Sequence, residues 1–321
     1  MAHAGAPGRM TALTPAPAGG AVGVIIGTYQ RPAMLRAAIA SVAAQTHPVA
    51  RIIVCDDGSG DETGQVVAEC AKQGAGPVVW LAGAHTGHPG RNRNQALGHL
   101  DGLDWVAFLD DDDTWERDKL ARQLARLDEG GVDLLGCGVT AIGPDGAVRR
   151  VYRPATGEVT LVSLATVNPF ATSGVILRRQ LFSELGGFDG HPRMVGWGDD
   201  YDLWIRAAAR GARLENLADP LVVYREGQGI MAAVGRDWDQ RAFSLARMTQ
   251  GLPGHAYAAA RRVLWGRHHA AAAEAALAHR HRLAAWRHAL QAAAFFPSRT
   301  AWATLAHVGR GRPPKGSRFN N

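Results

Sequence analysis

The sequence predicts an α/β protein with a mostly parallel sheet flanked by helices. Short apolar runs typical of buried strands alternate, in the first half of the chain, with segments whose apolar residues recur at helical spacing. Two of these runs, 51–55 and 105–109, lead directly into aspartates. Parallel strands present their carboxyl ends at one edge of the sheet, where open α/β sheets bind ligands. The pattern therefore predicts one shared site along that edge.

Four strands and their connecting helices account for the first part of the chain. Leu35, Ile39 and Val42 lie at i, i+4 and i+7 and give the first helix an apolar face, and Pro32 suits its first turn. The predicted strands cover 22–26, 51–55, 78–81 and 105–109, and the helices begin at Pro32, pass through 66–70, cover 91–100 and pass through 120–127.

The second part of the chain has a more mixed pattern. The Gly-Pro-Asp-Gly turn at 143–146 separates two strand-like runs and predicts a hairpin. Two glycines at 186–187 are expected to end a short helix. The remaining predictions are strands over 132–142, 147–152, 172–177 and 221–224, and helices over 180–185 and 203–210.

Alanine, histidine and arginine dominate beyond about Asp237 and predict a helical appendage. Leu283, Trp286 and Leu290 recur there at helical spacing among arginines. The histidines follow no metal-ligand spacing, so a solvated basic helix face is the simpler interpretation. The alternative is peripheral contact of these basic helices with an anionic membrane surface.

Composition divides the 321 residues into four segments. The first is rich in Ala, Pro and Gly, and the last is basic and polar, so both are predicted to be disordered. The segments are a leader (1–20), a main domain (21–236) with halves 21–115 and 116–236, a helical region (237–305) and a tail (306–321).

Several features of the whole chain favour a cytoplasmic protein. Its three cysteines are far apart and odd in number, which fits neither a zinc site nor a disulfide framework and indicates a reducing compartment. No stretch approaches the ~20 apolar residues of a membrane span, and the N-terminus lacks the apolar core of a secretory signal. The alternative is a cytoplasmic protein whose basic helices contact the inner face of the membrane.

Four consecutive aspartates, Asp110 to Asp113, follow the apolar run 105–109. Adjacent carboxylates repel one another unless something neutralises them. Carboxylate oxygens suit Mg²⁺ or Mn²⁺, which commonly bring a phosphate-bearing substrate with them. The competing interpretation is a solvated acidic turn at a helix N-terminus. Four acids directly after a hydrophobic strand favour the ligand site.

Taken together, the motifs resemble the family-2 glycosyltransferases over about residues 21–225. Each motif alone is weak, but the set occurs in the family's order. The segments that carry the resemblance are VGVIIGTYQRPAMLRAAIASVAAQT, IIVCDDGSGDET, GRNRNQAL, FLDDDDTW, GVILRRQLFSELGGFD and GDDYDLWIRAA. The resemblance implies a GT-A fold with a nucleotide-binding half (21–115) and an acceptor-binding half (116–236). It also implies inverting transfer from a nucleotide sugar, a UDP-sugar above all, helped by a divalent metal.

The resemblance also implies roles for individual residues on the donor side. Asp112 matches the principal metal ligand, with Asp110 as the other outer acid of the family's Asp-x-Asp motif, and Asp111 matches a ribose or sugar contact. The remaining nucleotide-binding matches are Thr28 and Tyr29 at the end of the first strand, Asp57 (or its neighbour Asp56) for the base, and Arg91 for the base or a phosphate. The alternatives without a ligand are that Asp57 caps a helix and that Arg91 forms a surface ion pair.

The acidic pair Asp199–Asp200 matches the family motif that holds the catalytic base. Asp200 is favoured as the base, with Asp199 as the second candidate, although either could simply cap the following helix. One base and a departing diphosphate give a single displacement at the anomeric carbon, and hence inversion. Trp197, between two glycines, is either an acceptor-binding residue that stacks on a sugar ring or a core residue.

One departure from the family pattern concerns the stretch after Tyr224-Arg225, where many relatives carry a histidine. Here the sequence continues Glu226-Gly227-Gln228-Gly229, without a histidine. Two interpretations follow: Arg225 or Gln228 helps to hold the diphosphate, or metal binding is weaker than in those relatives. The acceptor is expected to be a glycan, a lipid-linked molecule or a small molecule, and no nucleic acid is expected as a partner.

Two other functional classes remain open on the sequence. Asp110 and Asp112, with Gly198-Asp199-Asp200, also fit a haloacid-dehalogenase-like Mg²⁺-dependent phosphohydrolase. That motif normally lies on the first strand of its fold, and here three predicted strands precede it. The other open class is a carbohydrate-binding module without catalytic activity.

Overall fold

The computed structural model describes residues 19–60, 62–195, 198–226, 237–252 and 254–310. The chain forms two compact units, which we describe separately. Unit 1 comprises residues 1–159, 170–188 and 210–229, and unit 2 comprises 160–169, 189–209 and 230–321. Unit 2 thus takes two short segments from within the predicted main domain as well as the helical region after it.

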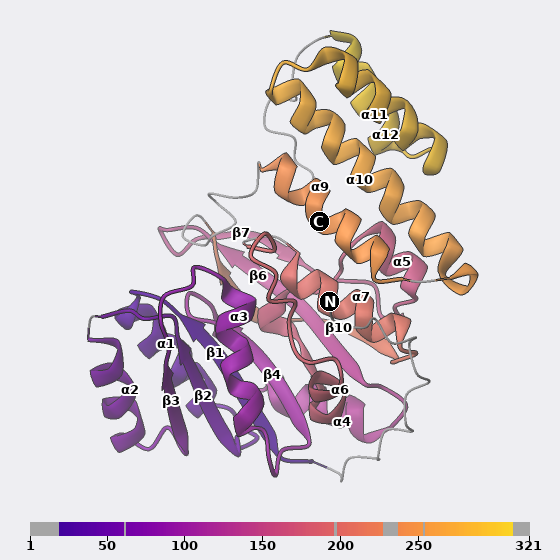
Figure 1. The fold of residues 1–321 in the computed structure, drawn as a ribbon. Helices are drawn as coiled ribbons and strands as arrows, with labels where there is room; N and C mark the ends of the chain where they lie inside the picture. Colours follow the sequence, from indigo (N-terminus) through magenta and orange to yellow (C-terminus); the bar gives the residue numbers. More distant parts are fainter. Residues whose placement is uncertain (1–18, 61, 196–197, 227–236, 253, 311–321) are drawn as a thin grey trace. The chain divides into compact units, whose positions relative to one another are not determined.

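Unit 1 is built on a ten-stranded mixed sheet of order β3-β2-β1-β4-β9-β6-β10-β5, with β7 paired to β6 and β8 to β10 (Figure 1). The first four strands pair in parallel, as predicted, and β9 is antiparallel to both of its neighbours. The strands are β1 (Val22–Thr28), β2 (Arg51–Asp56), β3 (Val78–Ala82), β4 (Trp105–Asp110), β5 (Thr114–Trp115), β6 (Leu134–Ile142), β7 (Val148–Tyr152), β8 (Gly157–Glu158), β9 (Ile176–Arg178) and β10 (Leu214–Arg225).

Successive side chains of a strand point to opposite faces of the sheet, and nearly all side chains of β1, β2 and β4 are buried, so both faces are covered there. On one face, Val24 and Ile26 of β1 join a core cluster with residues of α1, α2 and α4. On the other face, Phe108 of β4 contacts Phe182 and Phe188 edge to ring. The helical elements of unit 1 are α1 (Pro32–Ala43), α2 (Thr63–Lys72), α3 (Pro89–Arg93), α4 (Lys119–Asp128), α6 (Arg179–Glu184) and 3₁₀ turns at Asn94–His99 and Thr172–Gly174.

Three predicted elements of unit 1 have a different form or different bounds in the structure, and the short strands β5 and β8 were not predicted. The segment predicted as a helix over 91–100 is a short α-helix followed by a 3₁₀ turn, and the strand predicted over 172–177 begins as a 3₁₀ turn and becomes β9 only at Ile176. The last strand begins at Leu214 rather than Leu221. Its first part carries Glu215 and Asn216, so hydrophobic periodicity does not identify it.

Unit 2 consists of helices, of which α10, α11 and α12 pack along one another (Figure 1). Small residues such as Ala285 and Ala289 fill their contacts and allow close approach. The helices are α5 (Leu161–Thr166), α7 (Asp199–Ala209), α9 (Trp238–Gln250), α10 (Ala258–Ala278), α11 (Arg282–Phe295) and α12 (Arg299–Arg310), with a 3₁₀ turn at His255–Tyr257. Helix α12 therefore continues into the segment predicted as a disordered tail from residue 306. Among the described residues, no helix combines the length and apolar character needed to cross a membrane.

Candidate functional site

The carboxyl ends of β1, β2 and β4 bring the predicted donor-binding acids to one edge of the sheet. In the parallel register, Thr28 lies opposite Asp56 of β2, and Gly27 lies opposite Asp110 of β4. Thr28 joins the two sides, because its carbonyl accepts the Asp57 amide (3.0 Å) and its hydroxyl donates to Asp111 Oδ2 (2.7 Å). The sequence-based expectation that these strand tips share one edge is therefore met in the structure.

Carboxylates of Asp110, Asp112 and Asp113 form the core of the site. One oxygen from each lies within 4.8 Å of the others, an arrangement that can hold a metal ion. Asp112 and Asp113 are 7% and 2% exposed, so little water reaches them. Burial, and then the charge of Asp110, raise the pKa of Asp112 and raise that of Asp113 well above its usual range. Burial raises the pKa of Asp111 to about 6. A cation at this position would relieve the repulsion.

The donor set of this acidic cluster fits a hard divalent cation. Among the described residues it offers carboxylate oxygens only, from three side chains close together, without a thiolate or an imidazole. Mg²⁺ and Mn²⁺ prefer such oxygens, whereas softer metals prefer sulfur or nitrogen. Asp110 and Asp112 were predicted as ligands from the sequence. Asp113 was not, because nothing in a run of four aspartates indicates which side chains converge.

Two arginines partly neutralise the cluster. Arg31 Nη1 lies 2.8 Å from Asp112 Oδ2 and 3.2 Å from Asp111 Oδ1, and Arg93 contacts Asp110 Oδ1. Neither arginine was predicted as a site residue from the sequence. The arginine that was predicted, Arg91, has an exposed side chain in α3. Arg93, by contrast, is 7% exposed and also lies over the Phe188 ring. Residues two apart on a helix point in different directions, so the GRNR motif alone does not tell which arginine faces the site.

The Asp113 carboxylate is hydrogen-bonded to the 3₁₀ turn that precedes β9. The Ser173 hydroxyl donates to Asp113 Oδ2 (2.6 Å) and accepts the Asp110 amide (3.1 Å). The Arg225 amide, at the end of β10, donates to Asp113 Oδ1 (3.3 Å). Arg225 therefore reaches the cluster with its backbone, just before the stretch in which the sequence lacks a histidine. Gln228, the other candidate there, lies outside the described residues.

Asp57 is enclosed by the segment that follows β3. Its Oδ1 accepts from the amide and the hydroxyl of Thr86 (2.9 and 2.8 Å), and its Oδ2 accepts from the Gly87 amide (2.8 Å) and lies 3.0 Å from His85 Nδ1. The His85 ring stacks on Tyr29, with centroids 4.1 Å apart. Asp57 thus fixes a loop that presents a partly exposed aromatic pair beside the strand tips.

Asp56 has a different environment from Asp57. Its Oδ1 accepts from the amide and hydroxyl of Ser59 (3.0 and 2.6 Å), and its Oδ2 accepts from Trp80 Nε1 (3.3 Å). Asp56 is therefore occupied by the turn after its own strand. The Asp57 carboxylate is occupied as well, but by the loop that carries the exposed His85 ring.

Asp199 and Asp200, the two candidates for the catalytic base, are the first residues of helix α7 in unit 2. Gly198 precedes it with φ +97°, which favours glycine, and a Cβ there would lie 3.1 Å from side-chain atoms of Ser244 and Met248, which would have to shift. Asp199 is 8% exposed, whereas Asp200 is half-buried and accepts the Tyr201 amide (2.6 Å). Trp197, predicted to bind the acceptor, lies outside the described residues.

Two known proteins are similar to this chain in sequence. EpsE of Bacillus subtilis is 26% identical over 206 residues, which is 64% of this chain and 73% of EpsE. The poly(ribitol-phosphate) beta-N-acetylglucosaminyltransferase TarS of Staphylococcus aureus is 26% identical over 215 residues, 65% of this chain but only 37% of TarS.

Solved structures agree in fold over most of the chain. The structure of TarS residues 1–349 in complex with UDP-GlcNAc superposes with TM-score 0.61 and 20% identity, covering 91% of this chain and 92% of that one. The mannosyltransferase PcManGT from Pyrobaculum calidifontis, in complex with GDP-Man and Mn²⁺, gives TM-score 0.60 and 24% identity, covering 91% and 80%. These likenesses establish the GT-A type of fold.

Two family models match the chain directly. The model described as glycosyl transferase family 2 matches residues 23–186, which include every donor-side aspartate described above. The model described as glycosyl transferase family group 2 matches residues 105–308. With half of the chain covered by the first model, and with an α/β fold of the GT-A type, the chain belongs to glycosyltransferase family 2.

Proposed function

We propose that this enzyme transfers a sugar from a UDP-sugar to an acceptor hydroxyl with inversion at the anomeric carbon. The observation that carries the proposal is the convergence of Asp57 and the acidic cluster on the two sides of Thr28. One side offers a loop and aromatic pair suited to a nucleoside, and the other offers a cation-binding cluster suited to its diphosphate.

The nucleoside is assigned to the Asp57 side. The exposed face of the Tyr29–His85 pair offers a surface on which a base can stack. Asp57 holds the loop carrying His85 and Thr86, and it remains the acid assigned to the base. The UDP-GlcNAc bound by the TarS structure supports uridine as the nucleoside, although the fold alone also accommodates the GDP-Man of the mannosyltransferase.

The diphosphate is assigned to the acidic cluster. Asp110, Asp112 and Asp113 would hold Mg²⁺ or Mn²⁺, and the ion would supply positive charge against the diphosphate as it leaves. Arg31 and Arg93 hold their guanidinium groups at the same carboxylates. They can therefore bind phosphate oxygens or balance the acids before the donor arrives. The Mn²⁺ in the mannosyltransferase structure supports a divalent ion in this fold.

The base is assigned to Asp200, with Asp199 as the alternative. A carboxylate can accept the proton of the acceptor hydroxyl as the oxygen attacks the anomeric carbon. A single attack opposite the leaving diphosphate inverts that carbon. Asp200 is half-buried, which leaves its carboxylate more accessible to an acceptor than that of Asp199, 8% exposed.

The acceptor is assigned to the class of polyol or sugar hydroxyls. TarS, by its name, transfers N-acetylglucosamine to poly(ribitol-phosphate), a polymer that carries such hydroxyls. Because this chain covers only 37% of TarS, the polymer itself does not transfer with the fold. A glycan, a lipid-linked glycan and a small polyol are therefore the acceptors to test.

The other functional classes are less well supported. A phosphohydrolase would use Asp110 as a nucleophile, but the chain matches a transferase family, and Arg93 contacts the Asp110 carboxylate. A carbohydrate-binding module would need no base and no metal. It would keep its sugar affinity unchanged in an Asp200→Asn variant and would release no UDP.

The test combines ligand-induced stabilisation with turnover. Thermal melting is measured with UDP, GDP and their sugars, with and without Mn²⁺, because a ligand that binds the native state raises its stability by mass action. We expect a Mn²⁺-dependent increase for UDP ligands that is lost in Asp112→Asn and kept in Asp101→Asn, an exposed acid of the same unit. Asp200→Asn should keep that increase and lose UDP release. Phosphate release from p-nitrophenyl phosphate without nucleotide-sugar turnover would overturn the assignment.

A further inference from the structure

We propose that helices α11 and α12 form a docking surface for an anionic lipid bilayer. This inference goes beyond the transfer reaction and does not depend on it. The surface comprises Leu283, Trp286 and Leu290 of α11 and Trp302 of α12, together with four flanking arginines, Arg282, Arg287, Arg299 and Arg310.

The described part of the chain leaves much of the apolar part of this surface uncovered. Leu283 is 86% exposed, Leu290 58% and Trp302 59%, which is unusual for side chains of this size. Leu283, Trp286 and Leu290 lie at i, i+3 and i+7, so they share one face of α11. The opposite face holds the buried residues Ala285 and Ala289. Helix α11 is thus packed on its small residues and presents its large ones outward.

The two helices contribute to one continuous surface. A Cβ built on Gly309 of α12 would lie 3.7 Å from the ring of Trp286, so this indole of α11 reaches across to α12. Trp302 is seven residues before Gly309, two turns of helix, and therefore lies on the same side of α12. The leucines of α11 and both tryptophans accordingly face the same side of the helix pair.

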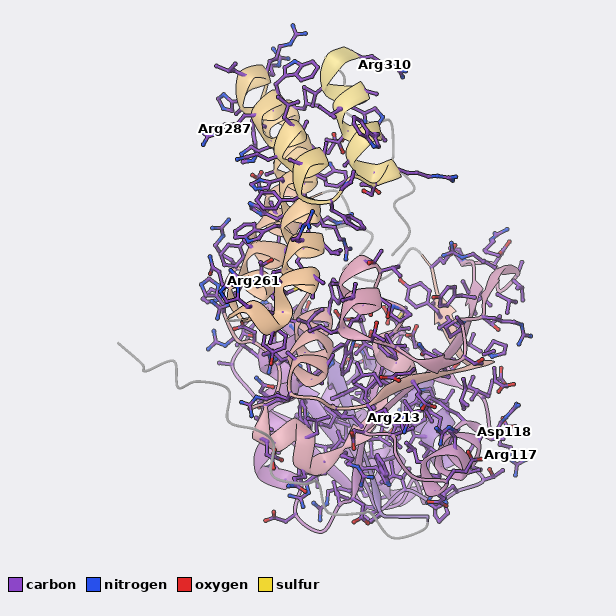
Figure 2. The ribbon with its side chains drawn as sticks, turned by 90° about the vertical axis from the view of Figure 1, so that its right-hand side faces the viewer. Arg117, Asp118, Arg213, Arg261, Arg287 and Arg310 are labelled. Atoms are coloured by element: carbon purple, nitrogen blue, oxygen red, sulfur yellow. The ribbon has the colours of Figure 1, made fainter. Side chains whose placement is uncertain are left out.

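Helices α11 and α12 carry arginines and no acidic residue. All acidic residues of the chain lie at or before Glu274, and residues 275–321 contain eight Lys and Arg. The formal charge of the chain is +6, so the first 274 residues together carry −2. Figure 2 shows Arg287 and Arg310 pointing away from the helices. The positive charge of this protein is thus concentrated in the segment that also exposes its leucines and tryptophans.

This combination identifies an anionic bilayer as the occupant. Leucine and tryptophan side chains enter the headgroup and acyl boundary, while arginines bind the lipid phosphates and anionic headgroups around them. A second copy of the chain would bring two acid-free, positively charged surfaces together, which repel. A nucleic acid would be attracted by the arginines but would gain nothing from the exposed leucines.

The test is co-sedimentation of the full chain with phosphatidylcholine vesicles that contain or lack phosphatidylglycerol. We expect binding only to vesicles with phosphatidylglycerol, and weaker binding at high salt. The double variants Leu283→Ser/Leu290→Ser and Arg282→Glu/Arg287→Glu should each reduce binding at least about 10-fold. Both change exposed side chains, and thermal melting checks that the helices remain folded.

The matched control is Val148→Ser/Val151→Ser, which removes exposed apolar side chains from β7 in unit 1. It should bind vesicles like the unaltered protein. The proposal would be overturned if the leucine and arginine variants sedimented with the vesicles as fully as the unaltered protein does, or if the unaltered protein did not sediment with phosphatidylglycerol vesicles at low salt. So would a dimer that dissociates on the leucine substitutions, which would assign the surface to a second copy. Donor hydrolysis, measured as UDP release in solution, should be the same in all four proteins, so failure of this inference leaves the proposed reaction untouched.

Discussion

Ser173 lies beneath the acidic cluster and bonds two of its members, donating to Asp113 Oδ2 at 2.6 Å and accepting the Asp110 amide at 3.1 Å. Its own carbonyl accepts Trp115 Nε1 at 2.7 Å, which fixes the 3₁₀ turn against the sheet. Ser173 is 2% exposed, so its hydroxyl bonds to these protein groups and not to solvent. Ser173 therefore acts as a positioning residue in the proposed cation site.

Ser173→Ala should weaken cation binding and leave the fold intact. Without the hydroxyl, Asp113 loses one of its two hydrogen bonds and can turn away from Asp110 and Asp112. Residues that orient metal ligands typically contribute about 10–100-fold to metal affinity or activity. We expect a higher Mn²⁺ concentration for half-maximal UDP release, with recovery at saturating Mn²⁺. Ser183→Ala, an exposed serine of α6, is the control. An unchanged Mn²⁺ dependence would remove Ser173 from the site.

Arg31→Gln should destabilise the metal-free protein more than the metal-loaded one. Arg31 pairs with Asp111 and Asp112, whose side chains are only 7% and 8% exposed, so its removal leaves buried carboxylates without their counter-charge. We expect a loss of about 1–2 kcal/mol in EDTA, allowing for the partial exposure of Arg31. Mn²⁺ should then stabilise the variant more than it stabilises the unaltered protein. Urea unfolding in EDTA and in Mn²⁺ gives the comparison, and an equal loss in both would show that Arg31 does not share the cation's role.

The parallel half of the fold and its acidic edge could be predicted from sequence because their signals are local. Apolar runs mark β1 to β4, and parallel pairing brings their carboxyl ends together, so Asp57 and Asp112 were expected at one edge. The contacts of Arg31 and Ser173 join residues about 80 and 60 positions apart along the chain. No local pattern encodes such pairings, and the convergence of Asp113 on Asp110 depends on a turn whose shape the sequence does not give.

Thr86→Val should weaken donor binding with little effect on the chemical step. The Thr86 hydroxyl donates to Asp57 Oδ1 at 2.8 Å and accepts the His88 amide at 3.2 Å, so it ties the loop to the acid assigned to the base. Valine keeps the shape and removes both hydrogen bonds, one of them to a carboxylate, each worth ~1–2 kcal/mol. We expect the KM for the UDP-sugar to rise about 10-fold with kcat nearly unchanged.

The control for the Thr86 variant is Thr166→Val, since the Thr166 hydroxyl donates to Val162 O within its own helix in unit 2. It should leave both kinetic constants as they are. If Thr86→Val lowered kcat and left KM unchanged, the loop would serve the reacting groups rather than the nucleoside.

Lys119 provides a test of stability against pH in the scaffold behind the site. It is fully buried, donates to Gln123 Oε1 at 2.7 Å and lies 3.9 Å from the Trp115 ring centroid, and burial lowers its pKa to about 8. Between pH 8 and the ordinary lysine value of 10.5 the unfolded chain keeps the proton that the folded protein has released. Stability of the unaltered protein therefore gains about 3 kcal/mol from Lys119 as pH rises through that window.

Lys119→Met removes this gain, because methionine fills similar space and does not titrate. The difference in free energy of unfolding between the two proteins should therefore shift by about 3 kcal/mol in favour of the unaltered protein from pH 7 to pH 10.5. The lost hydrogen bond to Gln123 adds a constant offset, since it does not depend on lysine titration in the variant. Urea unfolding at several pH values measures the shift, with Lys72→Met, an exposed lysine at the end of α2, as the control that should show none. Parallel pH profiles for Lys119→Met and the unaltered protein would mean that Lys119 keeps an ordinary pKa, and hence that water reaches its ammonium group.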